Sequence, residues 1–164
     1  MEGAATIDPK SQQVLQENLE KHLKEWSRGV VFSQDGKILA TTFDVDLNEI
    51  EDLTRIFDDS ENAFRFGAVI DGDHFDVHRF YPTLVYGRRG DSETGEGFCV
   101  CKTVKAVEQE GKAKTKKQAG SSSDGSDSSG KCIFTLITYA FPTLSARAIP
   151  QLQNFSKEFV EPLL

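Results

Sequence analysis

Residues 67–103 constrain the fold of this chain more than any other stretch, because they form four consecutive β-rich pieces separated by turn residues. Within them, Asp71-Gly72-Asp73 suits a tight hairpin, since glycine accepts a positive φ, and Pro82 fits only a strand edge or a turn. We therefore predict an antiparallel meander of four strands, each roughly four to seven residues long. The predicted strands lie within residues 67–73, 74–80, 83–90 and 97–103. Such a sheet needs a cover for its apolar face, and the rest of the chain must supply it.

Before the meander, the sequence predicts a helix, a hairpin and a second helix. Asp8-Pro9 is typical of a helix start, and apolar residues at helical spacing continue to about Trp26. The hairpin turns at Asp35-Gly36, between strands expected over residues 29–33 and 37–43. The second helix is expected over residues 47–57, with Asp46 as its cap and Glu49 reaching back in a capping box. Residues 58–62 are polar and indicate a break.

After the meander, residues 104–131 are rich in Lys, Ser and Gly and have too few apolar side chains to offset the entropy of ordering. We expect a flexible insertion there, between two strands. Residues 132–139 favour a strand, and apolar residues from Ala148 to Leu163 follow the spacing of a final helix. The whole chain, residues 1–164, is expected to form one α+β domain. Its single antiparallel sheet would have about seven strands, with the N- and C-terminal helices packed on one face.

Composition and motifs exclude several classes of function. A net charge of -7 argues against nonspecific nucleic-acid binding, and no apolar run approaches the roughly 18 residues that span a bilayer. Three cysteines form no disulfide framework, which favours a reducing, intracellular setting. The sequence has no phosphate loop and no dinucleotide fingerprint. Neither His74 with His78 nor the Cys99-x-Cys101 pair is sufficient for a metal site. We expect no catalysis, no cofactor and no metal.

The ordered set of motifs resembles the profilin family over nearly the whole chain, apart from the first residues and the insertion. The set comprises the hairpin 27–40, the 47–57 helix, Gly67-x4-Gly72-x2-Phe75-x-Val77, Gly87-Arg88-Arg89-Gly90, Lys102-Thr103, Ile137-x-Tyr139 and the amphipathic C-terminal helix. The resemblance implies a monomeric, non-enzymatic protein of the cytoplasm and cytoskeleton. It would bind monomeric actin stoichiometrically and so regulate filament assembly.

The resemblance also implies where actin would bind. The family's actin face uses the end of the second helix, the middle strands and the start of the C-terminal helix. On that pattern the contacts would be Phe64, His74, Arg79, Arg88, Arg89, Gln151 and Phe155. Val77-His78-Arg79 matches the family pattern directly. Charges at such a rim steer encounter and fix register, and an aromatic residue such as Phe64 would act as an anchor.

Two further ligands of profilins are expected to bind less well. Proline-rich segments stack on aromatic residues of the two terminal helices and the first hairpin. The equivalent positions here hold Leu15, Asn18 and Leu39, and only Phe159 is aromatic, so this binding should be weakened or absent. Arg88 and Arg89 with the lysines of residues 105–117 could meet a phosphoinositide headgroup, but the neighbouring glutamates and the negative net charge oppose it.

Two other interpretations of the same elements stay open at this stage. A scaffold or trafficking-complex subunit of the longin and roadblock type also has an antiparallel sheet with helices, and would be recognised by constitutive assembly. A sensor domain of the PAS class would hold a small ligand against the sheet. A C-terminal helix that returns across the N-terminal helix fits profilin and fits the PAS class poorly.

Overall fold

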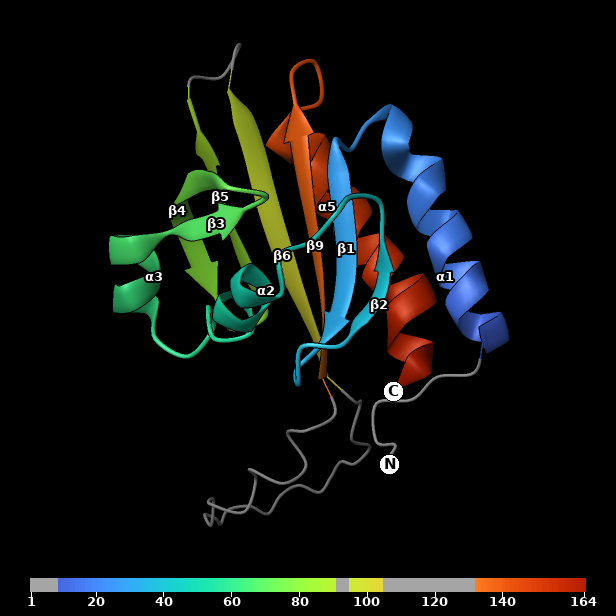
Figure 1. Cartoon of the computed structure of the whole chain (residues 1–164). Helices are drawn as coiled ribbons and strands as arrows, with labels where there is room; N and C mark the ends of the chain where they lie inside the picture. Colours follow the sequence, from blue (N-terminus) through green and yellow to red (C-terminus); the bar gives the residue numbers. More distant parts are fainter. Residues whose placement is uncertain (1–8, 91–94, 105–131) are drawn as a thin grey trace, which may run out of the picture.

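The computed structural model describes residues 9–90, 95–104 and 132–164, so the predicted insertion lies outside the described residues apart from Val104. Seven antiparallel strands form one sheet in the order β2-β1-β9-β6-β5-β4-β3 (Figure 1), which confirms the predicted α+β class and strand number. The strands are β1 (Arg28–Ser33), β2 (Ile38–Thr41), β3 (Ala68–Ile70), β4 (Asp73–Tyr81), β5 (Leu84–Arg89), β6 (Glu96–Val104) and β9 (Cys132–Ala140).

Four α-helices accompany the sheet in the described ranges: α1 (Pro9–Lys21), α2 (Leu47–Leu53), α3 (Ser60–Phe66) and α5 (Ser145–Phe155). A 3-10 turn, His22–Lys24, extends α1, and a π-helical turn, Ser156–Val160, extends α5. None of the helices in these ranges combines the length and the apolar character needed to cross a bilayer.

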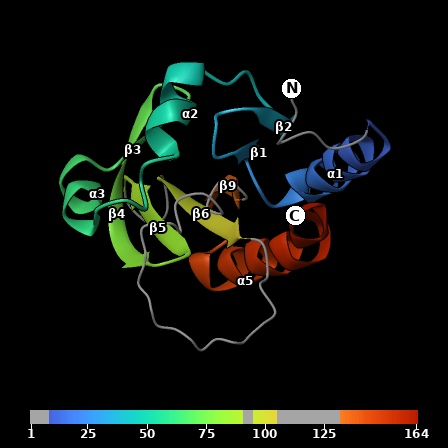
Figure 2. The ribbon, with the colours of Figure 1, turned by 90° about the horizontal axis from the view of Figure 1, so that it is seen from below.

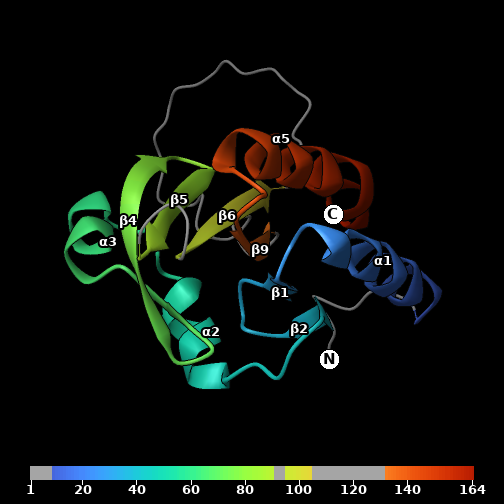
Figure 3. The same ribbon diagram turned by 90° about the horizontal axis from the view of Figure 1, so that it is seen from above.

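Helices cover both faces of the sheet. The terminal helices α1 and α5 lie together on one face, as predicted, and α2 and α3 lie toward the other (Figures 2 and 3). We call these the terminal-helix face and the α2 face. Each face has its own buried core, with Leu19, Val31 and Leu152 in the first and Ile50, Phe75 and Phe134 in the second. Successive strand residues point to opposite sides of a sheet, so consecutive apolar residues such as Val30 and Val31 supply one side chain to each core.

Contacts between the end of α1 and α5 fix the terminal helices to each other. Trp26 is buried, its ring stacks on His22 at 4.2 Å, and it meets Phe155 edge-on at 5.7 Å. Its Nε1 donates a hydrogen bond to Gln151 Oε1 (3.2 Å). The Glu25 carboxylate accepts hydrogen bonds from Arg147 Nε (2.7 Å) and Nη2 (3.0 Å), and this pairing lowers the pKa of Glu25 to about 2. The C-terminal helix therefore returns across the N-terminal helix, as the profilin resemblance implies.

The region between β2 and β3 differs from the sequence prediction in two ways. The predicted helix over residues 47–57 ends at Leu53, and a separate helix, α3, occupies most of the predicted polar break. Asp59 caps α3 by accepting a hydrogen bond from the Glu61 N–H (2.9 Å). Asp46 caps α2 as predicted, but the Glu49 carboxylate binds elsewhere: it accepts hydrogen bonds from the N–H groups of Asp71 (2.7 Å) and Gly72 (2.9 Å). Glu49 thus joins α2 to the β3–β4 turn.

An arginine on β1 also binds this turn, across the α2 face. Arg28 Nη2 is 2.7 Å from Glu96 Oε1 on β6, and its guanidinium contacts Asp71 (3.2 Å) and Asp73 (3.4 Å). Arg89 Nη2 contacts the same Asp73 (3.4 Å) and Glu96 (3.2 Å). We call these five residues the Arg28 network. It joins β1 to β4, which are separated by three strands (β9, β6 and β5) in the sheet order, and so holds the sheet in its curled shape.

Candidate partner-binding surface

The terminal-helix side of β4 and β5 carries exposed and half-buried polar and aromatic side chains instead of a packed core. We define the β4–β5 surface as Asp76, Arg79 and Tyr81 on β4 with Tyr86 and Arg88 on β5. α5 packs against β6 and β9, so the side chains of β4 and β5 lie at the margin of the area that α5 covers.

A β-bulge in β4 places Arg79 on this surface. Val77 pairs with Gly87 and Arg79 pairs with Tyr86, so His78 is an additional residue in the strand. Strict alternation would put Arg79 on the same face as Val77, in the α2 core. The bulge shifts the alternation by one residue, so that Phe80 turns to the α2 face instead. There the Phe80 ring lies 6.1 Å from the Phe57 ring.

Two tyrosines lie beside Arg79 and give the surface a flat aromatic centre. The rings of Tyr81 and Tyr86 stack at 6.4 Å with an interplanar angle of 29°. Burial raises the pKa of Tyr86, so its hydroxyl stays protonated near neutral pH and can donate a hydrogen bond. Arg79 Nη1 donates to the His78 carbonyl (2.9 Å), which holds the guanidinium near the bulge.

Arg88 lies at the other end of the surface, next to the start of α5. Its register partner on β6 is Gly97, which in turn pairs with Tyr139. The Tyr139 ring packs on Gly97, where a Cβ atom would come within 2.6 Å of it. The Tyr139 hydroxyl lies 2.6 Å from Ser145 Oγ, and burial raises the pKa of Tyr139 to about 12. A residue larger than glycine at position 97 would therefore displace the ring that adjoins Arg88 and α5.

The structure separates the residues that the resemblance implied would face actin. Arg79 and Arg88 lie on the β4–β5 surface. Arg89 does not, because adjacent strand residues point to opposite faces: it belongs to the Arg28 network and lies over the Phe75 ring at 5.6 Å. The resemblance implied one surface for Arg88 and Arg89, and the structure places their side chains on opposite faces of the sheet.

The remaining expected contacts lie in different places. Phe64 is 51% exposed on α3, and its ring lies 6.4 Å from the Phe80 ring, toward the α2 face. His74 is exposed on β4, and its Nε2 lies 2.7 Å from the Phe66 carbonyl oxygen. Gln151 hydrogen-bonds Trp26 and Glu25 in the α1–α5 contact. Phe155 is only 2% exposed. Its ring belongs to the core of the terminal-helix face, so little of it is accessible to a partner.

Two exposed apolar residues near Arg88 were missed by the sequence analysis. Phe141 and Leu144 are 58% and 50% exposed in the turn between β9 and α5. Strand register puts this turn at the same end of the sheet as Arg88, since Arg88, Gly97 and Tyr139 form one row. From the sequence, the residues around Pro142 indicate only a turn. A phenylalanine placed in a turn was the one sign of an exposed apolar residue.

The positions expected to bind proline-rich ligands lack an aromatic groove. Leu15 and Leu39 are buried, 1% and 2% exposed, and Asn18 Nδ2 donates to the Val14 carbonyl (2.8 Å). Phe159 is half-buried, with its ring 5.2 Å from Phe155. A shallow hollow of about 450 Å³ lies beside Leu39, but its lining residues are not aromatic: Pro9, Gln12, Gln13, Gln16, Glu17 and Leu39.

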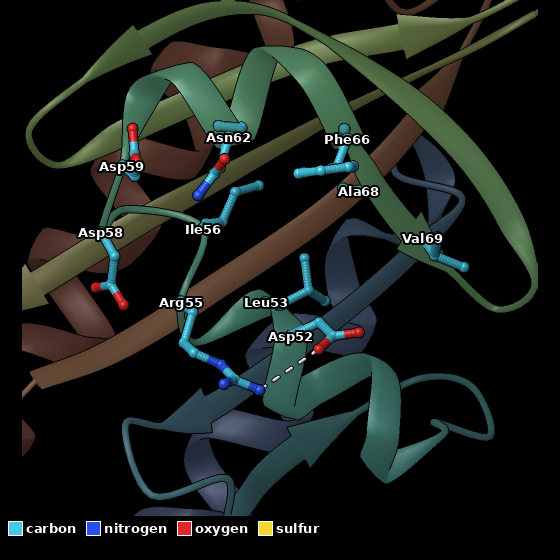
Figure 4. Close-up of a pocket in the computed structure, with 12 residues that line it drawn as sticks. Asp52, Leu53, Arg55, Ile56, Asp58, Asp59, Asn62, Phe66, Ala68 and Val69 are labelled. Carbon is cyan, nitrogen blue, oxygen red and sulfur yellow. Dashed lines mark ion pairs between the residues drawn. The ribbon is translucent and has the colours of Figure 1, made fainter.

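A more enclosed cleft, of about 440 Å³, lies between α2, α3 and β3 (Figure 4). Buried apolar side chains of Leu53, Ile56 and Ala63 form its floor. In the described part of the chain no group of three His, Cys, Asp or Glu residues is arranged to hold a metal ion. Burial raises the pKa of the Cys99 thiol well above its usual value, so this cysteine is a packing residue and a poor nucleophile.

A family model described as Profilin matches residues 10–107, more than half of the chain. The chain belongs to the profilin family. This assignment, with the terminal helices packed together, replaces the longin, roadblock and PAS interpretations. No curated protein sequence matches the chain.

Solved profilin structures share the fold at low sequence identity. Acanthamoeba castellanii profilin IA is 17% identical, with a TM-score of 0.65 over 93% of this chain and 98% of its own. Schizosaccharomyces pombe profilin is also 17% identical, with a TM-score of 0.65 over 91% of this chain and 96% of its own. LokiProfilin1, solved in complex with rabbit actin, is 10% identical, with a TM-score of 0.64 over 97% and 100%.

Proposed function

We propose that this chain binds monomeric actin through the β4–β5 surface and regulates filament assembly by stoichiometric binding in the cytoplasm. Membership of the profilin family supports this, as does the shared fold of LokiProfilin1, which was solved with actin. The observation that carries the proposal is the β4 bulge, which places Arg79 beside the stacked Tyr81 and Tyr86 on strands that α5 leaves open.

The surface combines the parts that a protein interface needs. Tyrosine and arginine are the residue types that most often dominate interface energetics, and the tyrosine pair offers flat apolar area at little cost in side-chain entropy. Arg79 and Arg88 supply positive charge on a chain whose net charge is negative. Such charges fix the register of a partner and speed its encounter. At the rims lie His74 on one side and the Phe141–Leu144 turn on the other. The proposal keeps His74, adds this turn, and leaves out the expected contacts that lie elsewhere: Phe64, Arg89, Gln151 and Phe155.

Charge reversal at Arg79 tests this assignment. Arg79→Glu should weaken binding to labelled monomeric actin about tenfold or more, because a negative charge replaces a positive one at the proposed interface. Its melting temperature should stay near that of the unaltered protein, since exposed substitutions change stability by about 0.5 kcal/mol or less. Lys157→Glu is the matched control, an exposed charge reversal on the π-helical turn after α5. Unchanged actin affinity of Arg79→Glu would refute the surface assignment.

We also propose that proline-rich ligands bind weakly or not at all. Support comes from the burial of Leu15 and Leu39 and from the half-buried state of Phe159, which leave little flat aromatic area for a polyproline II helix. The test is a polyproline peptide titrated against this chain and against a profilin with a complete aromatic groove. Equal affinities would contradict the proposal.

Phosphoinositide binding is disfavoured by the separation of Arg88 and Arg89. Arg89 is occupied by Asp73 and Glu96 on the α2 face, so the two guanidinium groups cannot act on one headgroup from the same surface.

A further inference from the structure

The cleft between α2, α3 and β3 is a second binding feature, separate from the β4–β5 surface. Its floor is apolar: Leu53, Ile56, Ala63 and Ala68 are each at most 7% exposed. Phe66 is 63% exposed at one end of the opening, beside β3 (Figure 4). An apolar side chain entering there would gain contacts with both the floor and the Phe66 ring.

The opposite end of the cleft is acidic. Asp58 and Asp59 lie there on the segment between α2 and α3, and Asp52 lies apart from them, beside Leu53 on α2 (Figure 4). The one basic residue in the lining, Arg55, is already paired with Asp52 (3.6 Å) and with Glu51 (3.9 Å). Within the described residues, the Asp58 carboxylate has no ion-pair or hydrogen-bond partner, so it is open to a cation supplied from outside.

The backbone of β3 adds directional hydrogen-bonding groups to the apolar end. β3 is an edge strand, paired with β4 only among the described strands. Asp71 and Gly72 form a two-residue turn, so the flanking pair Ile70–Asp73 exchanges hydrogen bonds and the pairs alternate from there. By that alternation the N–H and C=O of Val69, a residue that lines the cleft, point away from β4 and are not used in that pairing. An extended chain could pair with both groups.

We propose that this cleft binds an extended basic peptide segment of a partner protein. An apolar side chain of the peptide would fill the floor between α2 and α3, its main chain would pair with Val69, and its lysine or arginine side chains would meet Asp58 and Asp59. The lining of the cleft favours a peptide that is both basic and partly apolar. Three carboxylates against one arginine disfavour an acidic peptide, and the apolar floor disfavours a fully charged peptide. Because the cleft lies on the α2 face, the peptide and actin would bind to different surfaces.

The test uses a short fluorescein-labelled peptide in which lysine alternates with valine, titrated against the full chain by fluorescence anisotropy without actin. Saturable binding is expected, and it should weaken with salt because exposed charges are screened. Asp58→Lys should raise Kd about tenfold, since repulsion replaces attraction at the acidic end. Glu158→Lys makes the same charge change on an exposed residue after α5 and should leave Kd unchanged. Amide shifts on binding should centre on Ile56, Asn62 and Val69.

Four results would overturn the proposal. Equal effects of Asp58→Lys and Glu158→Lys, or equal binding of a peptide with glutamate in place of lysine, would show only general charge attraction. Amide shifts confined to the α1–α5 contact or to the β4–β5 surface would place the peptide elsewhere. A large gain in peptide affinity on deletion of residues 107–130 would show that the chain's own lysines occupy the cleft instead of a partner.

Discussion

Removal of the Arg28 guanidinium tests how the curled sheet is held. Arg28→Met keeps much of the aliphatic volume and removes the charge that contacts Glu96, Asp71 and Asp73. The Arg28 side chain is 14% exposed and that of Glu96 is 10% exposed, so water replaces little of the lost interaction. Arg89 remains 3.2 Å from Glu96 and keeps part of its charge balanced.

The expected loss follows from this burial. Removing one partner of a buried ion pair costs about 3–5 kcal/mol, whereas each pair with a half-exposed aspartate is worth about 0–1 kcal/mol. Because Arg89 still balances part of the Glu96 charge, the loss should lie at or below the lower end of this range, at about 2–3 kcal/mol. For a chain of this size, that corresponds to a fall in melting temperature of about 5–10 °C.

The pH dependence identifies Glu96 as the residue responsible. Burial tends to raise the pKa of Glu96, but the hydrogen bonds and charge of its partners, chiefly Arg28, outweigh it, so the pKa lies below 4.5. A depressed carboxyl pKa contributes stability that is present above pH 4.5 and is lost as the pH falls through the lower, folded value. Without Arg28 the burial effect weighs more heavily and the pKa of Glu96 should rise. The difference in unfolding free energy between the unaltered protein and Arg28→Met should therefore shrink as the pH falls below 4.5 toward the folded pKa of Glu96.

Urea unfolding at a series of pH values measures these differences. A second variant, Arg28→Met with Glu96→Gln, should recover part of the loss at neutral pH, because it removes a buried carboxylate that has lost the closer of its two arginine partners. If the unfolding free energy of Arg28→Met lay within about 0.5 kcal/mol of that of the unaltered protein, the range of an ordinary surface change, the account of the network would be refuted.

Two further predictions concern β6 and its neighbours. Gly97→Ala should destabilise the fold by about 1–3 kcal/mol in urea unfolding, since its Cβ would come within 2.6 Å of the buried Tyr139 ring; an unchanged midpoint would contradict the packing described. Deletion of residues 107–130 should leave unfolding cooperative, because Val104 and Cys132 are register partners and the three remaining residues can close a short hairpin. Broad, non-cooperative melting of that deletion would show that the segment is part of the core.

Much of the fold could be predicted from local patterns. The meander strands were found because alternating β-rich pieces separated by Gly, Asp and Pro have few other solutions. The prediction missed α3 because polar residues 58–62 indicate a loop when considered alone. The same residues, Asp59-Ser60-Glu61, are equally typical of a helix start. The choice between loop and helix depends on the burial of Ala63 against the sheet, which is a non-local contact.

The candidate surface was less predictable, because it depends on register. A single-residue bulge at His78 decides which face Arg79 occupies, and no turn or proline in the sequence marks it. Simple alternation separates Arg88 from Arg89, and the family resemblance alone had grouped them. Phe155 was assigned to a contact from its position on the C-terminal helix, but Trp26, far away in the sequence, covers it.

The central claim, that this profilin-family chain binds actin through the β4–β5 surface, is tested most directly by titrating it into labelled monomeric actin. Arg79→Glu and Lys157→Glu would be titrated in parallel. The account predicts saturable binding by the unaltered protein, retained by Lys157→Glu and weakened about tenfold or more by Arg79→Glu. Absence of binding by the unaltered protein would contradict the proposed function, and equal binding by all three would contradict the surface.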